Sequence, residues 1–518
     1  MPRERSDCTR RLAAVAVCLI IAYTAWQAWQ VAEAPYPARY DYDEGVYAET
    51  AAAWTRASRP YTDVFLSQPP AFVAALRAAY RVGGQNMIAA RAPVILGSTM
   101  WLASLFSILA AVGRPRAGLF AVCAAAGNAA FSVAAHTVQT DGPSEALAAA
   151  AMALAVVGAR GGALVWIVAG IAWALAVLTK LTAVTVALPL ILVGAVFRPP
   201  LSGADRSGPR RAIALCAAGI GAIATVGAFL PTLWTPAFPA EAIRYHVVAA
   251  RIVGPAPAAN LAAELAFLAG AWPLSAAAVA GAFTALADRR RRRARASESS
   301  AADWLSPVLL VWLAAEGAAL GTVTPLWPHH LILLVSPLAL LAGIGADAVL
   351  TRARALHRSV VVVAAAAVVA YVAAGAGTVS GSSAALRDAS AALARAVPPG
   401  GEVVTDDPLV PFLAGRPVPG ALIDTSIVRI QLGEVTERSL DDAIARPAVR
   451  AVVLWRGTFR GQLPGFVARA AALFPVVVAT NGTRRVLVRR TDGRRASDAS
   501  VAAARPTRPQ ARTIAAAR

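Results

Sequence analysis

Several polar segments interrupt the apolar N-terminal part of the chain, and their side chains can do chemistry. They are residues 41–49 (DYDEGVYAE), 67–70 (SQPP), 136–143 (HTVQTDGP) and 178–180 (LTK). Their carboxylates can accept a proton, and the lysine can stabilise the negative charge of a phosphate. They mark candidate catalytic positions, provided that the fold brings them to one place.

The main candidates also have a purely structural interpretation. Asp43 and Asp141 both precede helical segments, where aspartate is a favoured N-cap residue. Lys180 is the only lysine in an arginine-rich chain. A lone lysine at a helix end usually extends its ammonium group to the membrane surface, but an ionisable residue of a membrane helix is also a functional candidate. Both interpretations stay open at this point.

The composition predicts an all-α polytopic membrane protein. Of the 518 residues, 58% are hydrophobic and 15% are charged, whereas a soluble protein has about a quarter charged residues. The apolar residues form long blocks, and about 20 of them are needed to cross a bilayer core. We expect about eleven spans, at residues 12–31, 92–112, 117–134, 143–159, 163–178, 182–197, 212–233, 262–286, 305–323, 330–349 and 359–376.

Arginines orient these spans. The densest run, residues 289–295, directly follows an apolar block, and positive charge beside a span is typical of a cytoplasmic segment. The short loops on the other side hold only Lys180, Arg244 and Arg251. We therefore expect a multi-pass protein of the bacterial cytoplasmic membrane, with a cytoplasmic N-terminus and the polar segments outside. The net charge of +20 is explained by this anchoring, and we expect no nucleic-acid partner.

Two regions outside the spans are long enough to fold. In the first outer loop, residues 32–91, Tyr47, Ala51 and Trp54 share one face of a short helix. A second helix from Pro70 to Arg81 would end at the following glycines. Aromatic amphipathic helices of this kind lie flat at a membrane surface.

The last part of the chain predicts a small extracytoplasmic α/β domain over residues 379–490, after a membrane domain of residues 1–378. A helix-like run covers Ala384 to Ala396, and short apolar strands follow it. The strands are Glu402–Thr405, Arg450–Trp455, Phe474–Thr480 and Arg484–Val488. Asn481-Gly482 predicts a hairpin turn between the last two. Residues 491–518 have the composition of a disordered tail.

Histidines gather on the predicted outer side. His136, His246, His329 and His330 all fall there or at its membrane boundary. With Asp43, Glu44 and Asp141 they could bind a divalent metal ion, because imidazole and carboxylate suit several metals. The alternative is hydrogen bonding to lipid headgroups.

In their order and on one side of the membrane, these segments resemble the GT-C superfamily of membrane glycosyltransferases. The branch that they resemble contains protein O-mannosyltransferases and the lipid A aminoarabinose transferase. Its pattern has a DE-x-x-YAE block in the first outer loop, a K/Q-PP element, an Asp in the second outer loop, and T-K closing a later helix. Trp327 to His330 with Pro337 is similar to the late histidine-and-proline helix entry.

The resemblance implies an inverting hexosyl- or pentosyltransferase. A polyprenyl-phosphate carrier would supply mannose or another sugar, and the acceptor would be an extracytoplasmic lipid, polysaccharide or protein. Matched by position, Asp43 is the candidate base, with Glu44 and Asp141 as supporting carboxylates. Side chains that would contact the donor phosphate are Lys180, His246, Arg251 and Gln68. His136, His329 and His330 are candidates for a metal or acceptor site. Because the family-like motifs precede it, the α/β domain is expected to support acceptor selection or partner contact.

Two other functions remain as alternatives. A transporter of envelope lipids or solutes usually shows inverted repeats and polar residues at mid-membrane. The chain shows no convincing internal repeat, and its candidate residues lie at one rim, apart from Glu316 in the ninth span. A catalytically inactive scaffold is disfavoured by the presence of Asp43 and Asp141.

Overall fold

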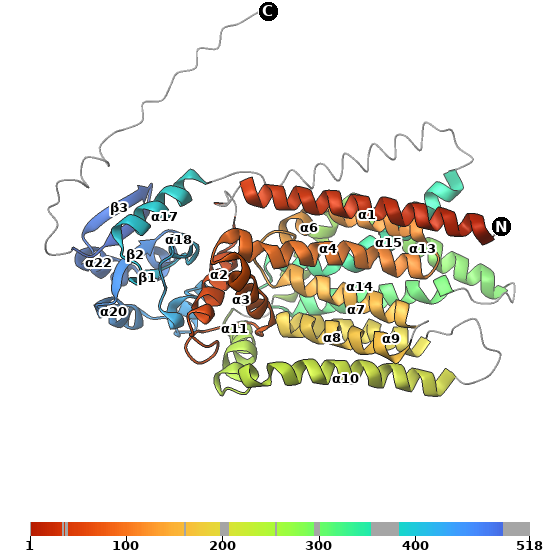
Figure 1. The fold of residues 1–518 in the computed structure, drawn as a ribbon, viewed down its shortest axis with the longest axis horizontal. Coiled ribbons are helices and arrows are strands. Elements are labelled where there is room, and N and C mark those ends of the chain that lie inside the picture. The colour runs from red at the N-terminus through yellow and green to blue at the C-terminus, as the bar shows by residue number, and fades with distance from the viewer. Residues whose placement is uncertain are drawn as a thin grey trace, which may run out of the picture.

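The structure, a computed structural model, describes residues 2–33, 36, 40–159, 162–196, 207–253, 256–294, 301–353 and 383–490. The predicted span 359–376, the predicted domain boundary at 378 and the tail 491–518 lie outside these residues. A bundle of helices fills one end of the molecule and an α/β domain the other, with short helices between them (Figure 1). The start of α1 lies at the end of the bundle away from the α/β domain.

The bundle shows that the chain is a multi-pass membrane protein, as predicted. Among the described residues, five helices are long and apolar enough to cross a membrane, or six if one bent pair counts as a span. The helical elements of the bundle are α1 (Pro2–Glu33), α4 (Met87–Ala111), α5 (Pro115–Ala126), α6 (Ala129–Ala134), α7 (Asp141–Gly158), α8 (Ala163–Thr179), η1 (Leu181–Val186), α9 (Ala187–Val196), α10 (Ser207–Leu233), α12 (Pro257–Gly270), α13 (Trp272–Ala294), α14 (Ala301–Thr322), η3 (Pro328–Leu334) and α15 (Val335–Ala353).

Two predicted spans are not continuous helices. The span expected at 262–286 is divided between α12 and α13, which are bent by 93° at their junction. Pro273 stands in the first turn of α13; proline has no amide hydrogen to donate and its ring clashes with the carbonyl group four residues earlier, which explains why α12 does not continue through it. The span expected at 117–134 is interrupted between α5 and α6, where the Asn128 side chain accepts hydrogen bonds from the amides of Ala130 and Phe131.

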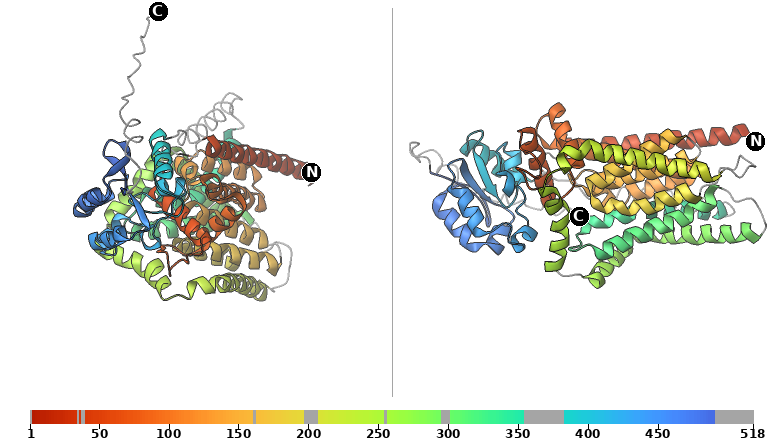
Figure 2. Two further views of the ribbon diagram at one scale, coloured as in Figure 1. Left: turned by 60° about the vertical axis from the view of Figure 1, so that its left-hand side comes forward. Right: turned by 90° about the horizontal axis from the view of Figure 1, so that it is seen from below.

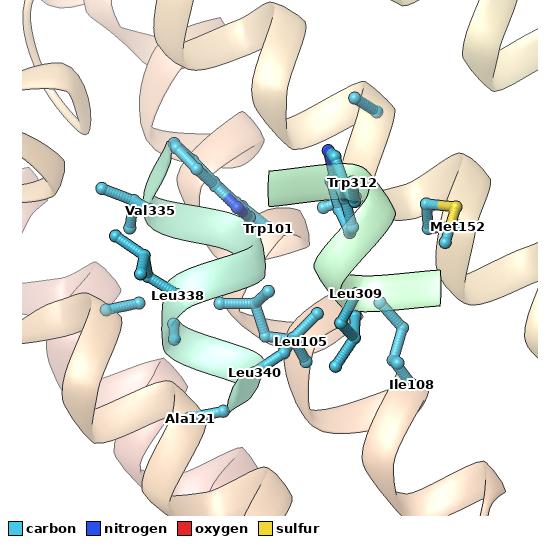
Figure 3. Packing of buried hydrophobic residues seen from close by; sticks show 14 of the residues in the cluster. Trp101, Leu105, Ile108, Ala121, Met152, Leu309, Trp312, Val335, Leu338 and Leu340 are labelled. Atoms are coloured by element: carbon cyan, nitrogen blue, oxygen red, sulfur yellow. The ribbon is translucent and has the colours of Figure 1, made fainter. Parts of the chain in front are cut away.

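The bundle is held by close helix packing around large apolar side chains. Trp101 and Leu105 of α4 meet Trp312 of α14 and Leu338 of α15 in the interior (Figure 3). Elsewhere small residues let backbones touch: a Cβ on Gly170 of α8 would collide with a carbonyl of α10. Glycine at such contacts is typical of membrane helices, where van der Waals packing drives association.

The loop predicted to lie outside, the first outer loop, forms a layer of short helices at the end of the bundle that faces the α/β domain. It contains α2 (Tyr42–Thr55) and α3 (Ala71–Gly83), close to the two predicted helices. Gly84, with φ of 76°, ends α3. A later loop adds η2 (Pro239–Arg244) and α11 (Tyr245–Val253) to the same layer.

The α/β domain contains the predicted helix and four strands. Its elements are α17 (Ala384–Ala396), β1 (Glu402–Thr405), α18 (Leu409–Leu413), η5 (Gly420–Leu422), α19 (Ile427–Gln431), α20 (Glu437–Ala445), β2 (Val449–Leu454), α21 (Thr458–Gln462), α22 (Pro464–Leu473), β3 (Val476–Asn481) and β4 (Arg484–Val488). The strand order is β1-β2-β4-β3. β1 and β2 are parallel, and β3 and β4 form the predicted antiparallel hairpin.

The α/β domain and the first outer loop share one hydrophobic core. Buried side chains of α2 and α3, such as Tyr47 and Leu76, belong to the same cluster as Leu409 and Val453 of the domain. Gly45 of α2 lies against the backbone of Leu409 so closely that a Cβ would collide with the Leu409 amide nitrogen. Figure 2 shows the domain seated directly on this layer. The domain is therefore part of the structure that positions the loop.

Candidate active site

Helix α2 presents Asp43 at its first turn. Asp41 is the N-cap residue, and its Oδ1 accepts a hydrogen bond from the Asp43 amide at 3.1 Å. The Asp43 side chain is half-buried. Among the described residues no group donates a hydrogen bond to its carboxylate. The capping role that the sequence allowed for Asp43 thus belongs to Asp41, and the Asp43 carboxylate is left free.

Asp141 and Lys180 form a buried ion pair between two bundle helices. Asp141 is the first residue of α7, after its N-cap Thr140, and Lys180 directly follows the end of α8. The Lys180 Nζ lies 2.6 Å from the Asp141 Oδ1. The side chains are 8% and 2% exposed, respectively, so Lys180 does not extend into solvent. The ammonium group of lysine has three N–H donors, so Lys180 can bind an anion while it stays paired with Asp141.

His329 lies between the carboxylates of Asp41 and Asp141. Its Nδ1 is 3.7 Å from the Asp41 Oδ2, and its Nε2 is 4.0 Å from the Asp141 Oδ2. The ring of His330 lies perpendicular to it, with centroids 4.6 Å apart. Both histidines stand in the first turn of η3, where Pro328 occupies the first position. The late histidine motif therefore reaches the loop that carries Asp43.

The environment of Asp43 suits a proton acceptor. Burial and the neighbouring Asp41 carboxylate raise the pKa of Asp43 to about 7. Burial also opposes ionisation of Asp41, but His329 and the Asp43 amide hold the pKa of Asp41 below its usual value. The pKa values of two neighbouring carboxyl groups are thus shifted in opposite directions. Such a divergence is common in acid–base sites.

Gln68 and His246 meet at one side of this site. The Gln68 Nε2 lies 3.4 Å from the His246 Nε2, and the same ring nitrogen lies 2.7 Å from the Ser67 carbonyl oxygen. Lys180 is close enough to act electrostatically on His246. Arg251 lies on α11, and its side chain is outside what the structure describes.

Glu44 and His136 lie apart from this group, around Arg91. The Glu44 Oε1 accepts hydrogen bonds from the Arg91 Nε and Nη2, at 2.9 and 2.7 Å, and from the Val138 amide at 3.2 Å. Glu44 is 1% exposed. Burial, with Arg91, lowers the pKa of His136 to about 3, so its imidazole is neutral at physiological pH. This geometry favours a role for Glu44 in fixing the loop.

Comparison with known proteins finds one family model that matches part of the chain, and several solved structures with a similar fold. Residues 67–223 match the family model of dolichyl-phosphate-mannose-protein mannosyltransferases. ArnT from Cupriavidus metallidurans, solved with undecaprenyl phosphate, has a TM-score of 0.60 at 17% identity, over 92% of this chain and 98% of that one. The Archaeoglobus fulgidus oligosaccharyltransferase has a TM-score of 0.54 at 13% identity, over 88% and 71%. The chain therefore shares the fold of these two membrane glycosyltransferases. No curated protein matches it by sequence.

One group of residues in the candidate site has the donor types of a metal site. Ligand atoms of Asp141, His329 and His330 all lie within 4.8 Å of one another. Carboxylate and imidazole bind zinc at about 2.0–2.2 Å, so the three groups would bind a common ion after a small approach. The Archaeoglobus enzyme, with a TM-score of 0.51 at 14% identity over 88% of this chain and 70% of that one, has also been solved in a complex with zinc and sulfate.

Two residues of the α/β domain lie beside the candidate site and carry no sequence signal. Asp424 accepts a hydrogen bond from the Tyr42 hydroxyl at 3.2 Å and acts electrostatically on Asp43. Arg456 lies over the ring of Tyr42, with 5.4 Å between its Cζ and the ring centroid. Asp424 and Arg456 lie hundreds of residues from Asp43 in the chain. They come close to the start of α2 because the α/β domain and the loop share one hydrophobic core. Asp41, in contrast, stood within the polar segment that begins the loop.

Proposed function

We propose that the protein transfers a sugar from a polyprenyl-phosphate carrier to a hydroxyl group of an extracytoplasmic lipid, polysaccharide or protein. The observation that carries the proposal is the position of Asp43. Its carboxylate is free of hydrogen bonds, has a pKa of about 7 and lies within electrostatic reach of Lys180 and His329. A base and a cation thus face the same small region at the outer end of the bundle.

The donor phosphate is assigned to Lys180. Lys180 is held by Asp141 at the boundary between the bundle and the outer layer. Gln68 and His246 supply further polar groups beside it, and Arg251 stands one turn further along α11. Cations beside a leaving phosphate stabilise the charge that develops in the transition state. The undecaprenyl phosphate in the ArnT structure is the kind of carrier that this arrangement fits.

The transfer proceeds by direct displacement with inversion at the anomeric carbon. The acceptor oxygen attacks that carbon while Asp43 takes its proton, and the bond from the carbon to the phosphate oxygen breaks. The electron pair of that bond leaves with the polyprenyl phosphate, whose charge Lys180 stabilises. With a pKa of about 7, a substantial fraction of Asp43 is ionised at neutral pH, and the carboxylate is basic enough to accept the proton. His329, between two carboxylates, maintains their spacing.

A divalent metal ion would be held by Asp141, His329 and His330, the group whose ligand atoms lie closest together. When bound, it would supply a second positive charge for the leaving phosphate. Asp41 faces His329 and keeps the imidazole oriented.

The site faces the aqueous side opposite the cytoplasm of a bacterial cytoplasmic membrane. The arginine-rich segments support this orientation, as does the position of α1, whose start lies at the end of the bundle away from the α/β domain. A carrier lipid can reach such a site from the bilayer, and the acceptor from outside.

The function is tested with purified protein in proteoliposomes and a panel of undecaprenyl-phosphate-linked hexoses and pentoses. We expect wild-type protein to release undecaprenyl phosphate from one of these donors and Asp43→Asn protein to release almost none. In a deletion strain, the same lipid-linked sugar should accumulate and be detectable by mass spectrometry. An unchanged pool of lipid-linked sugars in that strain, together with no turnover of any donor, would refute the proposal.

A further inference from the structure

The α/β domain fixes an arginine above the catalytic loop. β1 and β2 are parallel, so their carboxyl ends lie side by side. Asp406 follows β1, and its carboxylate accepts hydrogen bonds from the amides of Trp455 (2.6 Å), Arg456 (3.1 Å) and Gly457 (2.9 Å) after β2. Gly457 has a φ of 88°, which allows this tight turn. The backbone of Arg456 is therefore held in one position.

The guanidinium group of Arg456 reaches over the start of α2. Its Cζ lies 5.7 Å from the centroid of the Tyr40 ring and 5.4 Å from that of Tyr42. These two tyrosines flank Asp41, which is close enough to feel the charge of Arg456. The aromatic rings hold the cation by their electron-rich faces and leave its edge available.

Arg456 differs from Arg91 and Arg429 because its donors are uncommitted. Arg91 is bound by Glu44, and Arg429 by Glu434 and two carbonyl oxygens. For Arg456, the described part of the chain offers no acceptor within hydrogen-bonding distance of the guanidinium group. The side chain is exposed. Five N–H donors in a planar fork are thus presented to solvent at the start of α2, where Tyr42 precedes the candidate base Asp43.

We propose that Arg456 binds an oxyanion on the acceptor, a phosphate group close to the hydroxyl that Asp43 deprotonates. This assignment rests on the proposed function. Lys180 comes from the bundle, on the side from which a lipid donor enters, whereas Arg456 comes from the aqueous domain. The planar guanidinium group matches the oxygens of a phosphate in a bidentate contact. The domain would thus select acceptors that carry a negative charge beside the reactive hydroxyl.

The binding test uses sn-glycerol 3-phosphate as the probe, because it carries a hydroxyl group near a phosphate. Its binding to purified protein, with undecaprenyl phosphate present to occupy the donor side, is measured by broadening of the ³¹P resonance. Loss of a charge-assisted hydrogen bond corresponds to about 10- to 100-fold weaker binding, which we expect for Arg456→Gln. The matched control is Arg387→Gln, on an exposed arginine of α17 that pairs with Asp388. It should bind as wild type does.

A second variant and a second measurement distinguish a specific phosphate contact of Arg456 from misfolding and from a general effect of its positive charge. Arg456→Lys keeps the charge without the fork and should weaken binding by an intermediate factor. With the donor found in the panel, Arg456→Gln should slow transfer to sn-glycerol 3-phosphate but leave transfer to glycerol unchanged. Equal loss with both acceptors, or ³¹P broadening that is the same in wild type and folded Arg456→Gln, overturns the proposal. If the probe binds through Arg456 while no donor is turned over, the proposed function fails and the anion site stands.

Discussion

Lys180 and Asp141 lie 2.6 Å apart in a buried pair that joins the end of α8 to the start of α7. Neither charge is screened by solvent, so each depends on the other. The pair holds the chain's only lysine at the level of the loop that carries Asp43. It therefore connects the stability of the bundle to the geometry of the proposed donor site.

Replacing Lys180 by alanine separates these two roles. The single variant leaves Asp141 buried without a partner, which typically costs about 3–5 kcal/mol of stability, and it should also weaken binding of undecaprenyl phosphate. In the double variant with Asp141→Asn, we expect thermal stability to recover substantially because no charge is left unpaired. Donor binding should stay weak, by about tenfold or more. Wild-type affinity in the double variant would remove Lys180 from the donor site.

Asp43→Asn should lower turnover by about 10²–10⁴-fold, the usual contribution of a general base, with little change in donor binding. Because Asp41 is the N-cap of α2, the variant should keep its fold and its melting temperature. The control is Asp388→Asn, on the exposed surface of α17, which should leave turnover unchanged. Near-wild-type turnover in folded Asp43→Asn protein would contradict the catalytic assignment.

The pH dependence of the reaction should report the Asp43 carboxyl group. A base with a raised pKa of about 7 is protonated and inactive at low pH. We therefore expect kcat/KM to rise as pH increases through about 7 and then to level off. A profile that is flat between pH 5 and pH 9, with a stable protein throughout, would speak against Asp43 as the base.

Asp424→Asn should move that profile to lower pH. The negative charge of Asp424 is one of the influences that raise the pKa of Asp43, so its removal makes Asp43 easier to ionise. Asparagine can still accept the hydrogen bond from Tyr42, which keeps the contact between domain and loop. Asp388→Asn, on the exposed surface of α17, is the control and should leave the midpoint unchanged.

Gly45→Ala should loosen the α/β domain from the first outer loop. The added Cβ would collide with the Leu409 backbone, and overpacking of this kind costs about 1–3 kcal/mol or more. We expect faster proteolysis between the domain and the bundle, and lower activity. Gly219→Ala, in open space on α10, should do neither. Equal resistance of the two variants would show that the contact is not needed.

Orientation can be checked in cells with a chain whose four native cysteines are replaced. Single cysteines introduced at residues 60 and 430 should react with an impermeant thiol reagent, and one at residue 300 should not. Reaction at 300 alone would invert the proposed topology.

The sequence predicted those parts of the fold that depend on local pattern. In the strands of the α/β domain and in helix α17, apolar residues recur at strand or helix spacing, a pattern that is visible in the local sequence. The predicted bounds of these elements therefore lie close to the observed ones. The sequence analysis did not predict the break between α12 and α13. It identified spans by the length of an apolar block, and that length is the same whether or not the helix is bent near Pro273. Asp43, Asp141 and Lys180 could be placed on one side of the membrane from topology alone.

Tertiary contacts decided what the sequence left open. The sequence around Glu44 does not indicate that Glu44 pairs with Arg91. Likewise, the sequence around Arg456 does not indicate that its side chain contacts Tyr42. These contacts join residues from distant elements, and no local periodicity contains them. The capping alternative for Asp43 likewise required the structure, because Asp41 and Asp43 are both suited to begin a helix.

The hydrophobic core common to α2, α3 and the α/β domain limits how such enzymes can be recombined. A domain transplanted from a structurally similar enzyme would bring a foreign face to Gly45 and would disturb the turn that carries Asp43. Under the proposed function, acceptor preference and the position of the base would therefore depend on the same contact. A chimera that changes one will need compensating substitutions along the α2 surface to keep the other.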